Sequence, residues 1–195
     1  WDNIEIQPAA GDAGAALGAA ALIERPLWQG PYLGYEDYHS VTPEEAAERI
    51  IKGEIIPIIN GRAEFGPRAL GNRTLLCAPI IDTIDRLNLI KGRKEDTWRP
   101  YAPIVQDKEA DNFFEVIRPC TNMLFTAYIK EESNFKTHDN SARLQYIDGS
   151  QPYLYKVLEI TRQYGYPILI NTSLNAKGMP MVNKKEDLDE IRLHF

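Results

Sequence analysis

Residues 42–60 read TPEEAAERIIKGEIIPIIN, a helix followed at once by a strand. Thr42 is suited to cap a helix, Pro43 fits the first helical position, and Glu45 completes a capping box. The spacing of the apolar residues continues this helix over 43–52, and Gly53 ends it. The β-branched run 54–60 then predicts a short buried strand that ends in a turn-like Asn-Gly pair.

Helices and strands alternate along the rest of the chain, with short connections and no visible repeat. Strands are predicted at 74–80, 102–106, 123–130, 141–148 and 167–171, with a last strand after the loop 171–182. Helices are predicted at 81–93 and 152–165, the second closed by Gly165, and a final helix begins within 184–195. We therefore expect an α/β domain, a mixed twisted sheet flanked by helices, with the site in loops at strand ends.

The first forty residues predict a separate unit. Residues 4–24 suggest a strand, a Gly-rich turn carrying Asp12 and an Ala-rich helix. Residues 25–40 are dense in Pro, Gly and Tyr and lack periodicity, which is typical of a linker. Because the chain starts at Trp1 and stops within a predicted helix, we expect it to be a piece of a longer protein.

Composition limits the class of protein. The 195 residues are 44% hydrophobic and 26% charged, enough for one folded domain with a core. No run approaches the roughly 18 apolar residues of a membrane span, so we expect no membrane insertion. Cys77 and Cys120 are far apart and form no CxxC pair, which favours reduced thiols and a cytoplasmic location.

The net charge of −6 makes nucleic acid an improbable partner, but the charge is unevenly distributed. Residues 52–99 hold nine basic and six acidic residues, a net charge of +3 that leaves −9 for the rest. A basic island in an acidic protein suits a small anionic ligand better than a polyanion.

The densest motif is NGRAEFGPRALGNR, residues 60–73, which we call the Gly/Arg segment. It follows a predicted strand and holds Arg62, Arg68 and Arg73, one carboxylate, Glu64, and three glycines. Glycines let a backbone approach a ligand closely, and guanidinium groups form bidentate hydrogen bonds with phosphate or carboxylate. The segment is not a Walker loop, because GxxxxGK[ST] is absent. A solvated turn with surface arginines is the alternative.

Three further motifs could contribute. IKGRKEDTWRPYAP, residues 90–103, has a basic cluster and aromatic residues that could stack on a base, although a helix C-terminus also collects basic residues. HDNSARLQ, residues 138–145, carries Arg143, while His138 and Asp139 would point to opposite sides of an extended chain and make a poor catalytic pair. NTSLNAKG, residues 171–178, offers small polar groups at a strand end, which turn formation alone would also select.

These four motifs, in this order, resemble the C-terminal part of the O-carbamoyltransferase family that includes nodulation, cephamycin and aminoglycoside carbamoyltransferases. The resemblance implies a YrdC-like domain over residues 41–195. QPAAGDAGAALGAA, residues 7–20, resembles the end of the family's preceding actin-like ATPase domain. Residues 1–40 would then be a remnant of that domain plus a linker.

The resemblance also implies an activity. The domain would bind carbamoyl phosphate and ATP with magnesium and form carbamoyl-adenylate, and the preceding domain, with iron or a similar metal, would pass the carbamoyl group to a hydroxyl-bearing small-molecule acceptor. Several fixed cations must then face phosphate oxygens. The implied catalytic residues are Arg62, Arg68, Arg99 and Arg143, and the implied substrate- or nucleotide-binding residues are Lys91, Asn171, Ser173, Asn175 and Lys177.

Two positions depart from the family pattern. The family's His-x-Asp-Gly reads Thr137-His138-Asp139-Asn140 here, with the histidine displaced by one. Asp12 matches the family's metal-binding aspartate, but its histidine partners would precede Trp1, so we expect no stable metal site in this chain by itself.

Two other functions stay open at this point. One is a module that binds nucleotide or carbamoyl phosphate but is inactive without its preceding domain. The other is an RNA-binding domain with a basic concave face, against which the net charge of −6 counts.

Overall fold

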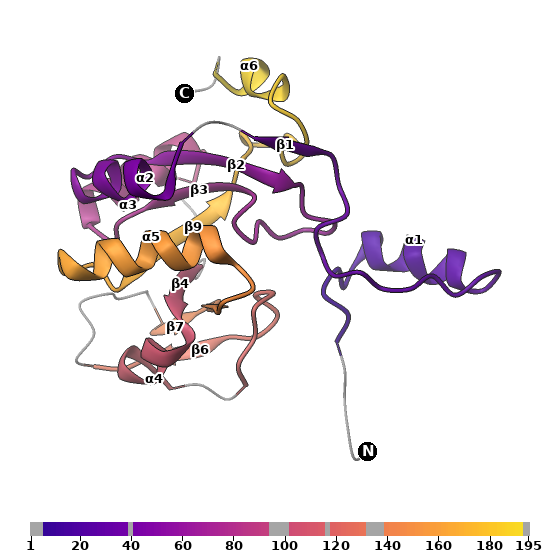
Figure 1. Cartoon of the computed structure of the whole chain (residues 1–195), viewed down its shortest axis with the longest axis horizontal. Helices are drawn as coiled ribbons and strands as arrows, with labels where there is room; N and C mark the ends of the chain where they lie inside the picture. The colour runs from indigo at the N-terminus through magenta and orange to yellow at the C-terminus, as the bar shows by residue number, and fades with distance from the viewer. Residues whose placement is uncertain (1–5, 39–40, 94–101, 116–117, 132–138, 193–195) are drawn as a thin grey trace.

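A six-stranded sheet runs through the centre of the molecule (Figure 1). The computed structural model describes residues 6–38, 41–93, 102–115, 118–131 and 139–192. The strand order is β1 (Glu36–Tyr38), β2 (Ile56–Arg62), β3 (Arg73–Cys77), β9 (Ile168–Ser173), β4 (Pro103–Gln106) and β8 (Gln145–Ile147). Neighbouring strands are antiparallel except β4 and β8, which are parallel. The predicted α/β class with a mixed sheet flanked by helices is confirmed.

The sheet separates two hydrophobic cores, because successive residues of a strand point to opposite faces. One face packs on α2 (Pro43–Ile51) and α5 (Pro152–Gln163), which lie side by side in Figure 1. The other face packs on α3 (Ile81–Ile90), α4 (Ala110–Phe113), a small second sheet and α6 (Asp187–Arg192). The first face takes Ile58, Leu76, Ile104 and Leu169, and the second takes Ile59, Leu75, Val105 and Ile168.

The small sheet consists of β5 (Phe114–Glu115), β6 (Ala127–Ile129) and β7 (Ser141–Ala142), all antiparallel. We expected one strand over 141–148, but β7 joins the small sheet and β8 joins the large one. Arg143 and Leu144 connect the two, and Leu144 is buried. Arg143 is therefore placed where the chain passes from one sheet to the other.

The predicted helix ends are confirmed at both α2 and α5. Thr42 Oγ1 accepts a hydrogen bond from the Glu45 amide at 3.2 Å, and α2 is followed by Gly53 with φ 83°. After α5, Gly165 has φ 89°, the left-handed conformation that ends helices.

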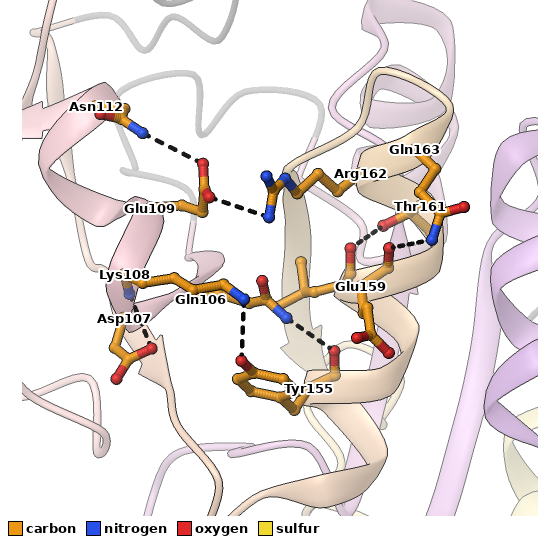
Figure 2. A network of polar contacts seen from close by, with 11 residues as sticks. Gln106, Asp107, Lys108, Glu109, Asn112, Tyr155, Glu159, Thr161, Arg162 and Gln163 are labelled. Atoms are coloured by element: carbon orange, nitrogen blue, oxygen red, sulfur yellow. Dashed lines mark hydrogen bonds and ion pairs between the residues drawn. The ribbon is translucent and has the colours of Figure 1, made fainter.

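Polar contacts tie α5 to the chain that leaves β4 through the short 3-10 helix η1 (Asp107–Glu109), as Figure 2 shows. Gln106 donates to the Tyr155 carbonyl at 3.2 Å, and Lys108 donates to the Tyr155 hydroxyl at 3.1 Å. Glu109 pairs with Arg162 at 3.1 Å. These contacts join the helix layer to the segment that leads into the small sheet.

Two segments differ from expectation. The predicted last strand is wrong: residues 174–186 contain no strand, and the loop folds back through a hydrogen bond from the Val182 amide to the Leu174 carbonyl at 2.9 Å. Pro180 lies in this loop, and proline cannot donate to a strand ladder. The strand suggested within 4–24 is absent at Ile6–Pro8, where the described part begins.

The first forty residues contribute one strand to the central sheet. β1 lies within the predicted linker and pairs with β2, with Tyr38 opposite Asn60. By contrast, α1 (Asp12–Ala21) buries no residue and projects from the rest of the molecule (Figure 1). The division into units at residues 1–40 and 41–195 stays a prediction.

Gly71→Ala tests the close approach of the Gly/Arg segment to α5. Gly71 has φ +117°, and an added Cβ would lie 2.4 Å from Cδ1 of the buried Leu154. We expect the free energy of unfolding, measured with urea, to fall by about 1–3 kcal/mol. The control is Gly149→Ala, where a Cβ meets nothing within 4 Å. Equal effects of the two substitutions would contradict this packing.

Candidate functional site

A cavity of about 380 Å³ lies where the Gly/Arg segment, α3 and the end of β9 meet. It is lined by parts of the chain that are far apart in sequence. Its polar lining comprises Arg68, Asn88, Arg93, Arg143, Asn171, Thr172 and Ser173, and its apolar lining comprises Pro67, Ala69, Leu87, Ala102, Met123 and Ile170. The predicted residues Arg68, Arg143, Asn171 and Ser173 therefore come together in one place.

Three arginines from three separate segments line this cavity. Arg68 comes from the Gly/Arg segment, Arg93 follows α3, and Arg143 lies between β7 and β8. No aspartate or glutamate is among the described residues that line it. Guanidinium groups match the geometry of phosphate and carboxylate oxygens, so the cavity is suited to an anion.

Arg93 and Asn88 were not among the predicted site residues. Arg93 belongs to a basic run that also suits a helix C-terminus, and this ordinary explanation hid it. The sequence signal was the glycine before Arg93. Gly92 has φ +61°, a conformation that favours glycine, immediately after α3. Asn88 lies within α3 and carries no comparable sequence signal.

Asn171 lies in the cavity wall, but its side chain is engaged by the protein. It has no exposed surface, and its Nδ2 donates to the Ala69 carbonyl at 3.1 Å and to Gln145 Oε1 at 2.8 Å. Its Oδ1 accepts from the Thr74 hydroxyl. The amide thus holds the Gly/Arg segment against β3 and β8.

Lys91 is likewise bound to the loop after β9. Its Nζ donates to the Ser173 carbonyl at 2.8 Å and to the Asn175 carbonyl at 2.7 Å, and also to Asn175 Oδ1. Ser173 Oγ donates to the same Asn175 oxygen at 2.6 Å. Burial, with the nearby charge of Arg93, lowers the pKa of Lys91 to about 7. Lys91, Ser173 and Asn175 form one network that shapes the loop.

The other predicted site residues lie elsewhere. Arg62 donates to the carbonyls of Leu33 and Gly34 at 2.9 and 3.2 Å and lines a separate cavity of about 290 Å³ beside Gly71. The aliphatic part of Lys177 packs over Gly92. Arg99 and His138 lie outside the described residues.

Asp12, the predicted metal ligand, is exposed at the start of α1. Within the described ranges, no three His, Cys, Asp or Glu residues form a group that could hold a metal ion. The helices in the same ranges include none with the length and apolar character that crossing a membrane requires.

Arg73, the third arginine of the Gly/Arg segment, is an internal brace. It has no exposed surface, and its guanidinium donates to the carbonyls of Asn183, Gly61, Asn72 and Tyr35 at 2.9–3.0 Å. Burial lowers the pKa of this group below its usual value. It joins β1, the Gly/Arg segment and the chain before α6.

Sequence comparison gives consistent matches over most of the chain. A family model described as Carbamoyltransferase C-terminus matches residues 47–194. Nodulation protein NolNO of Sinorhizobium fredii is 34% identical over 228 residues, covering 96% of this chain and 33% of that protein. The 3'-hydroxymethylcephem-O-carbamoyltransferase of Streptomyces clavuligerus is 32% identical over 212 residues, covering 96% and 40%. The chain thus spans about a third to two fifths of the length of these relatives.

Solved structures share the fold. Full-length HypF in a phosphate- and nucleotide-bound form matches with a TM-score of 0.57 and 15% identity, over 80% of this chain and 24% of that one. HypF of T. kodakarensis matches with a TM-score of 0.51 and 21% identity, over 78% and 19%. At these identities the similarity supports the fold alone.

The Lys91 network predicts a pH-dependent stability. The pKa of Lys91 is lower in the folded chain, about 7, than its ordinary 10.5, so between these values the unfolded chain binds more protons. The free energy of unfolding should therefore rise with pH for the wild type relative to Lys91→Met. Urea unfolding of both proteins at about pH 7 and about pH 9.5 measures this difference. A gap that does not change with pH would contradict it.

Proposed function

We propose, since the chain belongs to the carbamoyltransferase C-terminus family, that it binds ATP and carbamoyl phosphate in the arginine-lined cavity and forms carbamoyl-adenylate. The observation that carries this proposal is the convergence of Arg68, Arg93 and Arg143 on a cavity without an acidic residue among its described lining. The chain's own part of the reaction is then to hold two anions together.

Charge is the main obstacle to this reaction. ATP and carbamoyl phosphate each carry several negative charges, and fixed cations aimed at their phosphate oxygens offset the repulsion between them. Magnesium that enters with ATP would offset part of the phosphate charge. Apolar residues, among them Leu87, Met123 and Ile170, provide a wall for the uncharged part of the nucleotide.

The chemistry needs no nucleophilic side chain. Carbamoyl phosphate reacts with water to give carbamate and inorganic phosphate. A carbamate oxygen then attacks the α-phosphorus of ATP, the new P–O bond forms, and the bond to the leaving pyrophosphate breaks. Acceleration comes from placing the reactants and neutralising charge, which the three arginines can supply. Arg99 keeps its proposed part in this set.

The names of related proteins support the choice of substrates. One relative is named an O-carbamoyltransferase of a hydroxymethylcephem, and one HypF structure holds phosphate and nucleotide. Because this chain covers 33% to 40% of the relatives' lengths, transfer to a hydroxyl-bearing acceptor is a proposal for the whole protein. The same holds for a part played by Asp12 with iron or a similar metal, and for a cytoplasmic location.

Calorimetric titration of ATP with magnesium, and of carbamoyl phosphate, tests this function. We expect Arg68→Ala and Arg143→Ala each to weaken binding about tenfold or more, since a charge-assisted hydrogen bond contributes about 1.5–3 kcal/mol. The matched control is Arg49→Ala, which removes a surface arginine of α2 that is paired with Glu54 at 2.9 Å and does not line the cavity.

The outcomes distinguish a catalytic domain from a module that only binds its ligands. Pyrophosphate release that depends on carbamoyl phosphate would support catalysis by this chain. Binding without pyrophosphate would identify a module that is inactive without the preceding domain. Wild-type affinity in both cavity variants would contradict the proposal, as would equal losses in the Arg49→Ala control.

A further inference from the structure

A single carboxyl group, that of Glu64, binds the backbone of the Gly/Arg segment on the C-terminal side of Arg68. Glu64 Oε1 accepts hydrogen bonds from the amides of Leu70, Asn72 and Arg73 at 2.7, 2.8 and 3.3 Å. Glu64 thus lies at the start of the turn and binds three amides at its end. It supplies the acceptor that a neighbouring strand would otherwise supply.

Glu64 has no direct access to a ligand in the arginine-lined cavity. It is 7% exposed and is not among the cavity's lining residues. Its second oxygen, Oε2, is buried and has no hydrogen-bond partner among the described residues. Any effect of Glu64 on ligand binding must therefore act through its hydrogen bonds with the backbone.

The chain on the C-terminal side of Arg68 is held at successive residues. The Ala69 carbonyl accepts from Asn171 Nδ2, and the Leu70 carbonyl accepts from Gln145 Nε2 at 2.9 Å. The Leu70 amide is bound to Glu64. With the peptide groups at 69 and 70 fixed, the backbone position from which the Arg68 side chain extends is fixed as well.

We infer that Glu64 is a positioning residue, which sets the path of residues 66–72 through three backbone amides and thereby directs Arg68 into the cavity. This inference rests on the proposed function in one respect, the binding of an anion by Arg68. It assigns Glu64 a part in ligand affinity although Glu64 touches no ligand.

The three backbone amides require an oxygen that accepts hydrogen bonds, and this oxygen need not carry a negative charge. Burial raises the pKa of Glu64 above its usual value, while the amide hydrogen bonds act in the opposite direction. Among the described residues, the charged or titratable groups that interact with it include Tyr32 and Arg73. Glutamine keeps one accepting oxygen at nearly the same place, whereas leucine has the same approximate size and no acceptor.

The test compares Glu64→Leu with Glu64→Gln, each alone and combined with Arg68→Ala, in calorimetric titrations of ATP with magnesium. We expect Glu64→Leu to weaken binding about tenfold and Glu64→Gln less than about threefold. In the Arg68→Ala background, Glu64→Leu should add less than about twofold, because residues that act through one another are not additive.

Two results would overturn the inference. Losses that multiply in the Glu64→Leu, Arg68→Ala double variant would show that the residues act independently. Loss in Glu64→Gln as large as in Glu64→Leu would show that charge matters rather than the acceptor.

Hydrogen exchange of the wild-type amides gives a second measurement if Glu64→Leu does not fold. The Leu70 and Asn72 amides should exchange about 100-fold more slowly than free peptide amides, and unprotected amides would overturn the inference. If the wild type binds no ATP, the proposed function fails while exchange still tests the hydrogen bonds of Glu64 to these amides.

Discussion

Buried backbone groups need hydrogen-bond partners, and residues 63–72, the part of the Gly/Arg segment between β2 and β3, meet this requirement without forming a strand or a helix. Its partners are the side chain of Glu64, which lies within the segment just after β2, and the side chains of Gln145 in β8 and Asn171 in β9. Gln145 and Asn171 have no exposed surface, and buried polar groups are costly unless they are bonded, so their hydrogen bonds to the backbone favour one arrangement of the segment. The position of Arg68, and with it the shape of the cavity, depends on that arrangement.

The part of the cavity wall at Ser173 is likewise held by hydrogen bonds from a side chain to the backbone. Lys91 reaches from the end of α3 and binds the carbonyls of Ser173 and Asn175, which turns the chain after β9 beside the cavity. Neither wall depends on a long element, because both are short segments held by side chains of the sheet and of α3. The proposed binding of an anion and the stability of the fold therefore depend on the same hydrogen bonds.

Much of this architecture follows from local sequence. The capped helix α2, the Gly165 end of α5 and the apolar strands β2, β3, β4 and β9 were predictable because each is specified by its own residues. The family resemblance placed Arg68 and Arg143 in one site, and both line the same cavity. Sequence alone does not reveal which protein groups a polar side chain binds, so the hydrogen bonds of Asn171, Asn175 and Lys91 to the protein could not be predicted. The pairing of β1 and the split between β7 and β8 depend on partners distant in sequence, and the last predicted strand was replaced by a loop containing Pro180.

The passage of the chain between the two sheets has a consequence for ligand size. Arg143 is one residue from the small sheet and two from the large one, whereas the residue after Arg68 is bound to Asn171 of the large sheet. A shift of the small sheet would move Arg143 and leave Arg68 in place. The distance between these two guanidinium groups thus depends on how the two sheets pack against each other. Substitutions in the segment that forms the small sheet would change this distance while the central sheet stays unchanged.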